Sequence, residues 1–290
     1  MGSPNRHLSS EKVSAAITRL EHLPSSVRVA QKALEATLDP LCTNERVQHI
    51  LMADPGASAG TLKLANSAYF GVPSQIRTLA LAVAIVGRRR LSLLLRHLIA
   101  CKLMETLSFQ GQAAEKARTV ALAAAIACRD ISEQSHLQDL DEMSVVGLLH
   151  NIGELALLSE LPDECEQIDR LAEGMERGLA EIAVLGVDSF QVSRWLLEAW
   201  HFPRIYIDSA GYWNHPQHAA VSLGSRAHVG TVRIGACLAR AWAEGGDEET
   251  AIFSAADSAF ARAHLQPDAL SGIFDRMGTG VEQLRQSFSV

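Results

Sequence analysis

The sequence predicts an all-α protein with two lobes, an N-terminal helical lobe and a second helical bundle. Alanine and leucine are abundant, and segments in which Val, Ile or Thr alternate with polar residues are scarce. Apolar residues recur instead at helical spacing, and residues that typically cap helices separate these runs. The 290 residues, 48% of them hydrophobic, suffice for one large or two small domains with a sizeable core.

The first lobe is expected to consist of short helices. Residues 26–38 carry apolar side chains at helical spacing before a proline ends the run, and another helix is expected from about Thr43. Asp54-Pro55 indicates the next helix start, because Asp caps free amides and Pro fits the first helical position. This helix is expected to reach about Phe70, with Gly71 as its left-handed closing residue.

Thr78 is expected to cap a helix through Val86, and residues 91–104 continue as an apolar helix. A polar, glycine-containing stretch at 105–115 is the best candidate for a boundary between lobes. Beyond it, helices are expected at 116–129, 142–159, 178–200, 204–213 and 222–243. The predicted division is a disordered or expression-derived tail at 1–10, the N-terminal lobe at 11–110, the second lobe at 111–250 and a C-terminal helical tail at 251–290.

Composition argues against several function classes. A formal net charge of −7 disfavours nonspecific binding to nucleic acid or to an anionic membrane. The five cysteines are widely spaced and never form a CxxC pair, which indicates reduced thiols rather than a disulfide framework or a zinc site. The sequence has neither a long uncharged apolar run nor the apolar core of a signal peptide, so we expect a cytoplasmic protein.

The main functional question is whether one short motif could hold a metal ion. This motif is the run Gly147-Leu-Leu-His150-Asn151-Ile-Gly153 in an apolar helical stretch. A His followed by Asp can present an imidazole nitrogen and a carboxylate to one divalent cation. Asn151 keeps the shape of Asp but not its charge, so it contributes far less to holding or activating a metal-bound water. A lone His on an apolar helix, such as His150, is more often a hydrogen-bonded core residue than a metal ligand.

Three polar residues of the first lobe are further candidates for binding. Asn66 and Ser67 interrupt an apolar helix and could face a partner or small ligand, although Asn66 could equally fix the angle between helices. Arg88, in the run Gly87–Arg90, could contribute to a phosphate-binding patch. Three consecutive arginines on a helix cannot all face one way, which favours a solvated face instead.

No catalytic residue, metal site or cofactor is assigned. The sequence contains no GxSxG elbow, no P-loop, no GxGxxG after a strand and no HExxH. His215 and His218 lie three residues apart, but no Asp or Glu accompanies them in that short run, which favours a surface loop over a metal site.

Several stretches together resemble the HDOD domain family, the bacterial signalling relatives of HD-type phosphohydrolases. They are Leu23-Pro24 before an apolar helix, Asp54-Pro55, the run LKLANSAYFG at 62–71 and the run GLLHNIGELAL at 147–157. The likeness spans roughly residues 13–240. It implies an all-helical first lobe followed by a bundle related to the HD hydrolase fold.

The resemblance also implies a degenerate site. Catalytic HD relatives hold metal with an early His, an adjacent His-Asp pair and a later Asp. These positions fall here at Arg118, at His150-Asn151 and at Ala236. An Arg would repel a divalent cation, while Asn and Ala remove two anionic ligands, so metal-assisted hydrolysis is not expected.

We therefore expect a noncatalytic bacterial signal-transduction or scaffold module that binds a protein partner, and the resemblance implies a link to two-component or cyclic-di-GMP signalling. Two alternatives remain open. One is a divergent metal-dependent phosphohydrolase that retains His150 and recruits His215 or His218. The other is a sensor of a nucleotide or another anionic small ligand, in which Arg118 attracts a phosphate.

Overall fold

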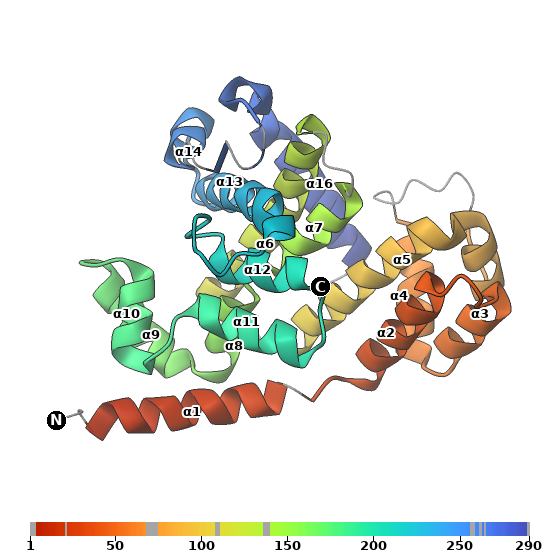
Figure 1. The fold of residues 1–290 in the computed structure, drawn as a ribbon, viewed down its shortest axis with the longest axis horizontal. Coiled ribbons are helices and arrows are strands. Elements are labelled where there is room, and N and C mark those ends of the chain that lie inside the picture. The colour runs from red at the N-terminus through yellow and green to blue at the C-terminus, as the bar shows by residue number, and fades with distance from the viewer. Residues whose placement is uncertain are drawn as a thin grey trace. The chain divides into compact units, whose positions relative to one another are not determined.

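The computed structural model describes residues 4–20, 22–67, 75–107, 111–135, 140–255, 259–260, 263 and 265–288. Every regular element in these ranges is a helix, which confirms the predicted all-α class (Figure 1). The chain forms two compact units, each discontinuous in sequence. We call residues 23–106 with 275–290 the small unit, and residues 1–22 with 107–274 the large unit.

The small unit is built around the long helix α5. Its helices are α2 (Ser25–Leu38), α3 (Asn44–Met52), α4 (Pro55–Ala65), α5 (Leu79–Thr106) and most of α16 (Ile273–Phe288). Helix α5 packs against α2, α3 and α4. The break expected after Val86 is confirmed, because Gly87 has φ 74° and ψ 160° inside α5.

The predicted caps of the small unit are confirmed, whereas one predicted helix end is wrong. Asp54 Oδ1 accepts a hydrogen bond from Ala57 N at 2.8 Å, and Thr78 Oγ1 accepts one from Leu81 N at 3.2 Å. Helix α4 ends at Ala65 instead of reaching about Phe70. Phe70 itself and the expected closing residue Gly71 lie outside the described residues.

The large unit contains the remaining helices. They are α1 (Pro4–Leu20), α6 (Gln112–Gln134), α7 (Leu140–Leu149), α8 (Ile152–Glu160), α9 (Pro162–Ala172), α10 (Arg177–Leu185), α11 (Ser189–Ala199), α12 (Arg204–Tyr212), α13 (Arg226–Ala243) and α14 (Glu248–Ser254), with short 3-10 turns at Leu223–Ser225 and Pro267–Leu270. Helix α6 packs against both α7 and α13 (Figure 1).

Helix α1 begins at Pro4, inside the range that the sequence analysis assigned to a tail. Three contacts tie its second half to the rest of the large unit. Lys12 forms an ion pair with Glu164, and Arg19 forms one with Glu160 at 2.6 Å. The indole nitrogen of Trp200 donates to the Leu20 carbonyl at 3.0 Å.

Two predicted helices of the large unit are each divided in two. The expected helix 142–159 is interrupted between α7 and α8 by His150 and Asn151. The expected helix 178–200 is interrupted at Gly186, which closes α10 in the left-handed conformation with φ 81°. Asp188 then starts α11, because its side chain accepts a hydrogen bond from Gln191 N at 2.7 Å.

Candidate functional site

The candidate site lies at the junction of α7 and α8, and two glycines position that junction. A Cβ atom added at Gly147 would lie 2.5 Å from the Ala124 carbonyl oxygen on α6. A Cβ atom added at Gly153 would lie 2.0 Å from the Ser189 carbonyl oxygen at the start of α11. Both glycines therefore allow close contact between backbones, which no other residue would permit without separating the helices.

His150 is held in one tautomer at this junction. Its Nδ1 atom lies 2.7 Å from the Gly147 carbonyl oxygen, which can only accept, so Nδ1 carries the proton and Nε2 presents a lone pair. The side chain is 1% exposed, and this burial lowers the pKa of His150 to about 4. The imidazole is therefore neutral at pH 7. Its Nε2 atom has no hydrogen-bond partner among the described residues.

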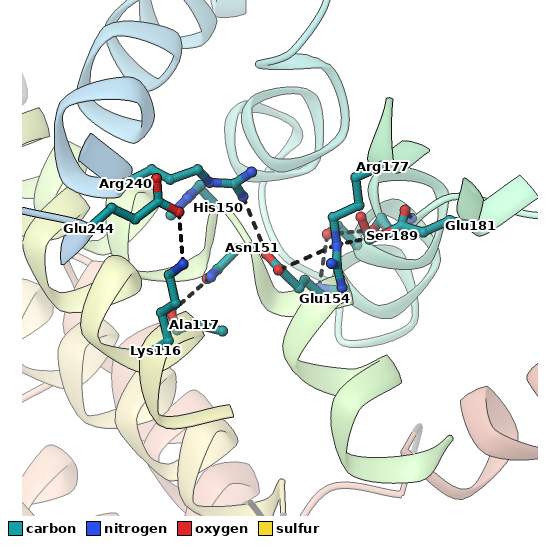
Figure 2. Close-up of polar contacts among 12 residues, drawn as sticks. Lys116, Ala117, His150, Asn151, Glu154, Arg177, Glu181, Ser189, Arg240 and Glu244 are labelled. Atoms are coloured by element: carbon teal, nitrogen blue, oxygen red, sulfur yellow. Dashed lines mark hydrogen bonds and ion pairs between the residues drawn. The ribbon is translucent and has the colours of Figure 1, made fainter. Parts of the chain in front are cut away.

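Asn151 connects the junction to α6. Its Nδ2 atom donates to the Ala117 carbonyl oxygen at 3.0 Å, a contact that Figure 2 shows. Its Oδ1 atom is buried and, within the described part of the chain, has no hydrogen-bond partner. An ionised Asp could not donate to the Ala117 carbonyl, so the amide has a structural role here that a carboxylate could not fill.

His150 and Asn151 line a cavity of about 200 Å³ that lies wholly within the large unit. The wall comes from α8, α10, α11, α13 and three connecting segments. The other residues that line it are Glu154, Glu176, Arg177, Gly178, Glu181, Ser189, Phe190, Ser193, Trp213, Asn214 and Arg240.

Acidic and basic side chains are paired across this cavity. Glu154 lies between Arg177, whose Nε atom is 3.7 Å away, and Arg240, whose Nη2 atom is 3.6 Å away (Figure 2). Arg177 also lies 3.3 Å from Glu181 and 2.5 Å from Asp169. Burial raises the pKa of Glu181, which accepts a hydrogen bond from Ser189 N at 2.7 Å.

The structure brings together two of the four positions that the resemblance singled out. His150 and Asn151 both line the cavity. Arg118 does not line it; its guanidinium forms an ion pair with Glu115 at 2.8 Å on the same helix. Ala236 is buried in α13, does not line the cavity and has no side-chain donor atom.

Asn66 and Ser67 lie in the small unit and hydrogen-bond to nearby backbone. Asn66 Oδ1 accepts from Ile76 N at 2.7 Å, and its Nδ2 donates to the carbonyls of Ile76 and Leu62 at 2.7 and 2.8 Å. Ser67 Oγ donates to the Leu64 carbonyl at 2.8 Å. These bonds turn the chain after α4, which explains why that helix ends before Phe70. A binding role for either residue stays a prediction.

Arg88 also lies in the small unit, just after the Gly87 break. Its guanidinium donates to the carbonyls of Thr37 at 3.0 Å and Cys42 at 2.8 Å, and further to those of Ala36 and Asp39. These carbonyls lie in the last turn of α2 and the loop behind it, so Arg88 satisfies groups that the helix leaves unpaired. Anion binding by Arg88 stays a prediction.

Sequence reasoning missed the charged part of the cavity. Glu154 offered a usable signal, because it follows Asn151 by three residues and a helix places such residues on one face. Arg177 and Arg240 offered none, since only the packing of α10 and α13 around α8 brings them to Glu154. The ring of Trp213 contacts His150 edge-on, with the ring centroids 5.6 Å apart.

The donor atoms of the cavity do not fit a catalytic metal. His150 and Asn151 supply one imidazole nitrogen and one amide oxygen, both neutral. The carboxylates of Glu154 and Glu181 also line the cavity, but they are ion-paired with the guanidiniums of Arg177 and Arg240. Across the described ranges, no three His, Cys, Asp or Glu side chains are grouped so that they could hold a metal ion. His218 is engaged elsewhere, because its Nδ1 accepts from Ala220 N at 3.1 Å and its ring stacks on Tyr212.

Comparison with known proteins gives a family and a fold. The profile of the HDOD domain matches residues 23–216. An HDOD domain protein of unknown function from Geobacter sulfurreducens is similar in structure, with a TM-score of 0.73, 18% identity and coverage of 97% of each chain. A presumed phosphohydrolase from Shewanella amazonensis gives a TM-score of 0.70 at 23% identity, over 96% of this chain and 98% of that one.

A presumed signal transduction protein from Marinobacter aquaeolei gives a TM-score of 0.70 at 18% identity, over 99% of this chain and 67% of that one. At such identities these similarities show the fold alone. No curated protein sequence matches the chain. None of the described helices combines the length and the apolar composition needed to cross a bilayer.

Proposed function

The chain belongs to the HDOD domain family, and from this premise we propose that it is a noncatalytic signal-transduction or scaffold module that acts by binding a protein partner. One observation carries the proposal. The His150–Asn151 pair presents two neutral donor atoms to the cavity, and the carboxylates of Glu154 and Glu181 in its wall are ion-paired with two arginines. Metal-dependent hydrolysis would instead need anionic ligands that are available to a divalent cation.

The links between helices support the same proposal. Asn151 donates to Ala117 on α6, and Glu154 lies between two arginines from other helices. The polar side chains at the junction therefore link α8 to α6, α10 and α13. Polar residues used to join helices in this way suit a module whose output is binding.

The proposal also covers where the protein acts and the kind of signalling to which it contributes. The fold is shared with a presumed signal transduction protein, and we propose a bacterial, cytoplasmic role connected to two-component or cyclic-di-GMP signalling. The phosphohydrolase alternative would need ligands besides His150, and the anion-sensor alternative would need Arg118 in the cavity. Neither His215 nor His218 lines the cavity, and Arg118, which does not line it either, is ion-paired with Glu115.

The noncatalytic half of the proposal is tested by metal content and turnover. Protein purified without chelator, incubated with Mn²⁺ and dialysed, should contain no stoichiometric metal and should not hydrolyse bis(p-nitrophenyl) phosphate. A metal-dependent HD phosphohydrolase assayed in parallel shows that the assay detects turnover. Stoichiometric metal together with turnover that His150→Ala abolishes would refute the proposal and establish the enzyme alternative.

The binding half is tested by affinity capture with the full chain. A signalling protein from the source bacterium should be retained by the chain and not by an unrelated acidic helical protein. It should also form a complex of fixed stoichiometry when both components are purified. If no captured protein re-forms a complex from purified components, the protein-binding role is wrong.

A further inference from the structure

The proposed binding of a protein partner gives no role to several polar atoms in the cavity beside His150. His150, Asn151 and Trp213 line it and are 1%, 4% and 7% exposed. Their Nε2, Oδ1 and Nε1 atoms have no hydrogen-bond partner in the described part of the chain. The Nε atom of Arg177, which also lines the cavity, has no hydrogen bond there either, but it is ion-paired with Glu154 and Glu181. In these states Nε2 and Oδ1 can only accept, whereas the indole Nε1 can only donate. A matching occupant therefore supplies at least two donors and one acceptor.

The charges around the cavity favour an uncharged occupant. Glu154 and Glu181 balance Arg177 and Arg240, and the acidic partner of each arginine is within 3.7 Å. An anion would have to displace Glu154 from between the two guanidiniums. A cation would face the same guanidiniums, and desolvating any added charge is costly. The remaining charged lining residue, Glu176, is exposed and receives a hydrogen bond from Asn214.

The volume and the wall of the cavity further restrict the class of molecule that could bind there. A cavity of about 200 Å³ has room for roughly seven water molecules, or a compact molecule with a similar number of non-hydrogen atoms. Phe190 and Trp213 form an aromatic wall, edge to face with ring centroids 5.4 Å apart. Such a wall suits the C–H face of a small molecule. A hydroxyl group both donates and accepts, so a single compound with several hydroxyls could form hydrogen bonds with the unpaired atoms of His150, Asn151 and Trp213.

We propose that this cavity binds a small uncharged polyol. In the complex, adjacent hydroxyls donate to His150 Nε2 and Asn151 Oδ1, and a further oxygen accepts from Trp213 Nε1. This inference deepens the proposed function by adding a ligand input to the module. It rests on that proposal only in requiring that no metal ion occupies the cavity.

The test uses saturation-transfer NMR on the full chain with glycerol, erythritol, xylitol and ribose as probes. At least one probe should bind, and Gly178→Leu should abolish the signal. Gly178 lines the cavity, and a Cβ there would have its nearest neighbour, Glu176 Oε1, at 3.9 Å, so the added side chain has room. Gly174→Leu is the matched control, because Gly174 does not line the cavity and a Cβ there meets nothing closer than 4.0 Å.

A second variant tests the hydrogen bonding. Trp213→Phe removes the N–H donor but keeps an aromatic ring, and it should weaken binding of the best probe about fivefold. The inference is overturned if none of the four probes binds, if Gly178→Leu binds as well as the parent chain, or if inorganic phosphate or tetramethylammonium binds more tightly. A metal ion at His150 would refute both proposals, whereas a metal-free cavity that takes no polyol refutes only this one.

Discussion

At the residue scale, position 151 shows why an amide and a carboxylate are not interchangeable in this fold. The Asn151 amide donates to the Ala117 carbonyl on α6, and its oxygen remains free to accept. An ionised Asp can accept but cannot donate. The loss of the metal-binding carboxylate and the gain of a link between helices are therefore two consequences of one substitution.

We expect Asn151→Asp to destabilise the large unit by about 3 kcal/mol at pH 7, because the Ala117 carbonyl loses its donor and faces a buried negative charge. Urea unfolding monitored by tryptophan fluorescence measures this, since all four tryptophans belong to the large unit. The control is Asn44→Asp, an exposed position in the first turn of α3 where a negative charge is favourable.

The same variant also tests the metal argument. Asn151→Asp should not take up Mn²⁺, because Ala236 supplies no ligand and Arg240 remains in the cavity wall. Unchanged stability together with stoichiometric Mn²⁺ would show that position 151 is a vacant metal ligand rather than a link between helices.

At the scale of the helices, close backbone contact determines where α8 lies. A Cβ at Gly153 would lie 2.0 Å from the Ser189 carbonyl oxygen and 2.6 Å from Ser193 N. Both atoms belong to the α11 backbone, so neither can rotate away. Helix α8 would have to move off α11, and the cavity that both helices line would change shape.

Gly153→Ala should therefore lower the unfolding free energy of the large unit by about 3 kcal/mol, as overpacking between two backbones does. The measurement is again urea unfolding by tryptophan fluorescence. Gly174→Ala is the control and should change stability by no more than about 0.5 kcal/mol, because a Cβ there meets no atom closer than 4.0 Å. Equal stability of the two variants would contradict the close contact between α8 and α11.

In the small unit, the C-terminal end of α2 depends on Arg88. Replacing Arg88 by Ala leaves the carbonyls of Thr37 and Cys42 without these donors, and we expect local destabilisation of about 2 kcal/mol. Hydrogen–deuterium exchange should then be roughly 30-fold faster in the last turn of α2. The exposed neighbour Arg89 provides the control variant, Arg89→Ala, which should leave exchange in that turn unchanged. Faster exchange in both variants would mean that net charge, not the hydrogen bonds, protects α2.

At the scale of the whole molecule, features set by neighbouring residues could be predicted from sequence. The all-α class follows from composition and apolar spacing, and the caps at Asp54 and Thr78 follow from one side chain each. The end of α4 could not be predicted, because it depends on Asn66 meeting Ile76 ten residues later. The cavity was missed for the same reason, since Arg177 and Arg240 are brought to Glu154 only by tertiary packing.

The buried His150 should make the stability of the large unit depend on pH. Burial, with a smaller contribution from Arg240, lowers its pKa from 6.5 to about 4, while the bond to the Gly147 carbonyl acts in the opposite direction. Between about pH 6.5 and about pH 4, His150 is therefore protonated in the unfolded chain but not in the folded chain. The unfolding free energy should fall as the pH drops from about 6.5 to about 4, and this contribution should be constant above that range.

The difference between a pKa of 6.5 in the unfolded chain and about 4 in the folded chain corresponds to a loss of about 3 kcal/mol in the free energy of unfolding. Urea unfolding followed by tryptophan fluorescence at pH 7, 6, 5 and 4 should show this loss relative to His150→Gln, which cannot titrate. Other acidic and basic groups titrate in both proteins, so their effects cancel in the difference. Parallel stability curves for the two proteins across this range would mean that burial does not lower the pKa of His150 in the folded chain.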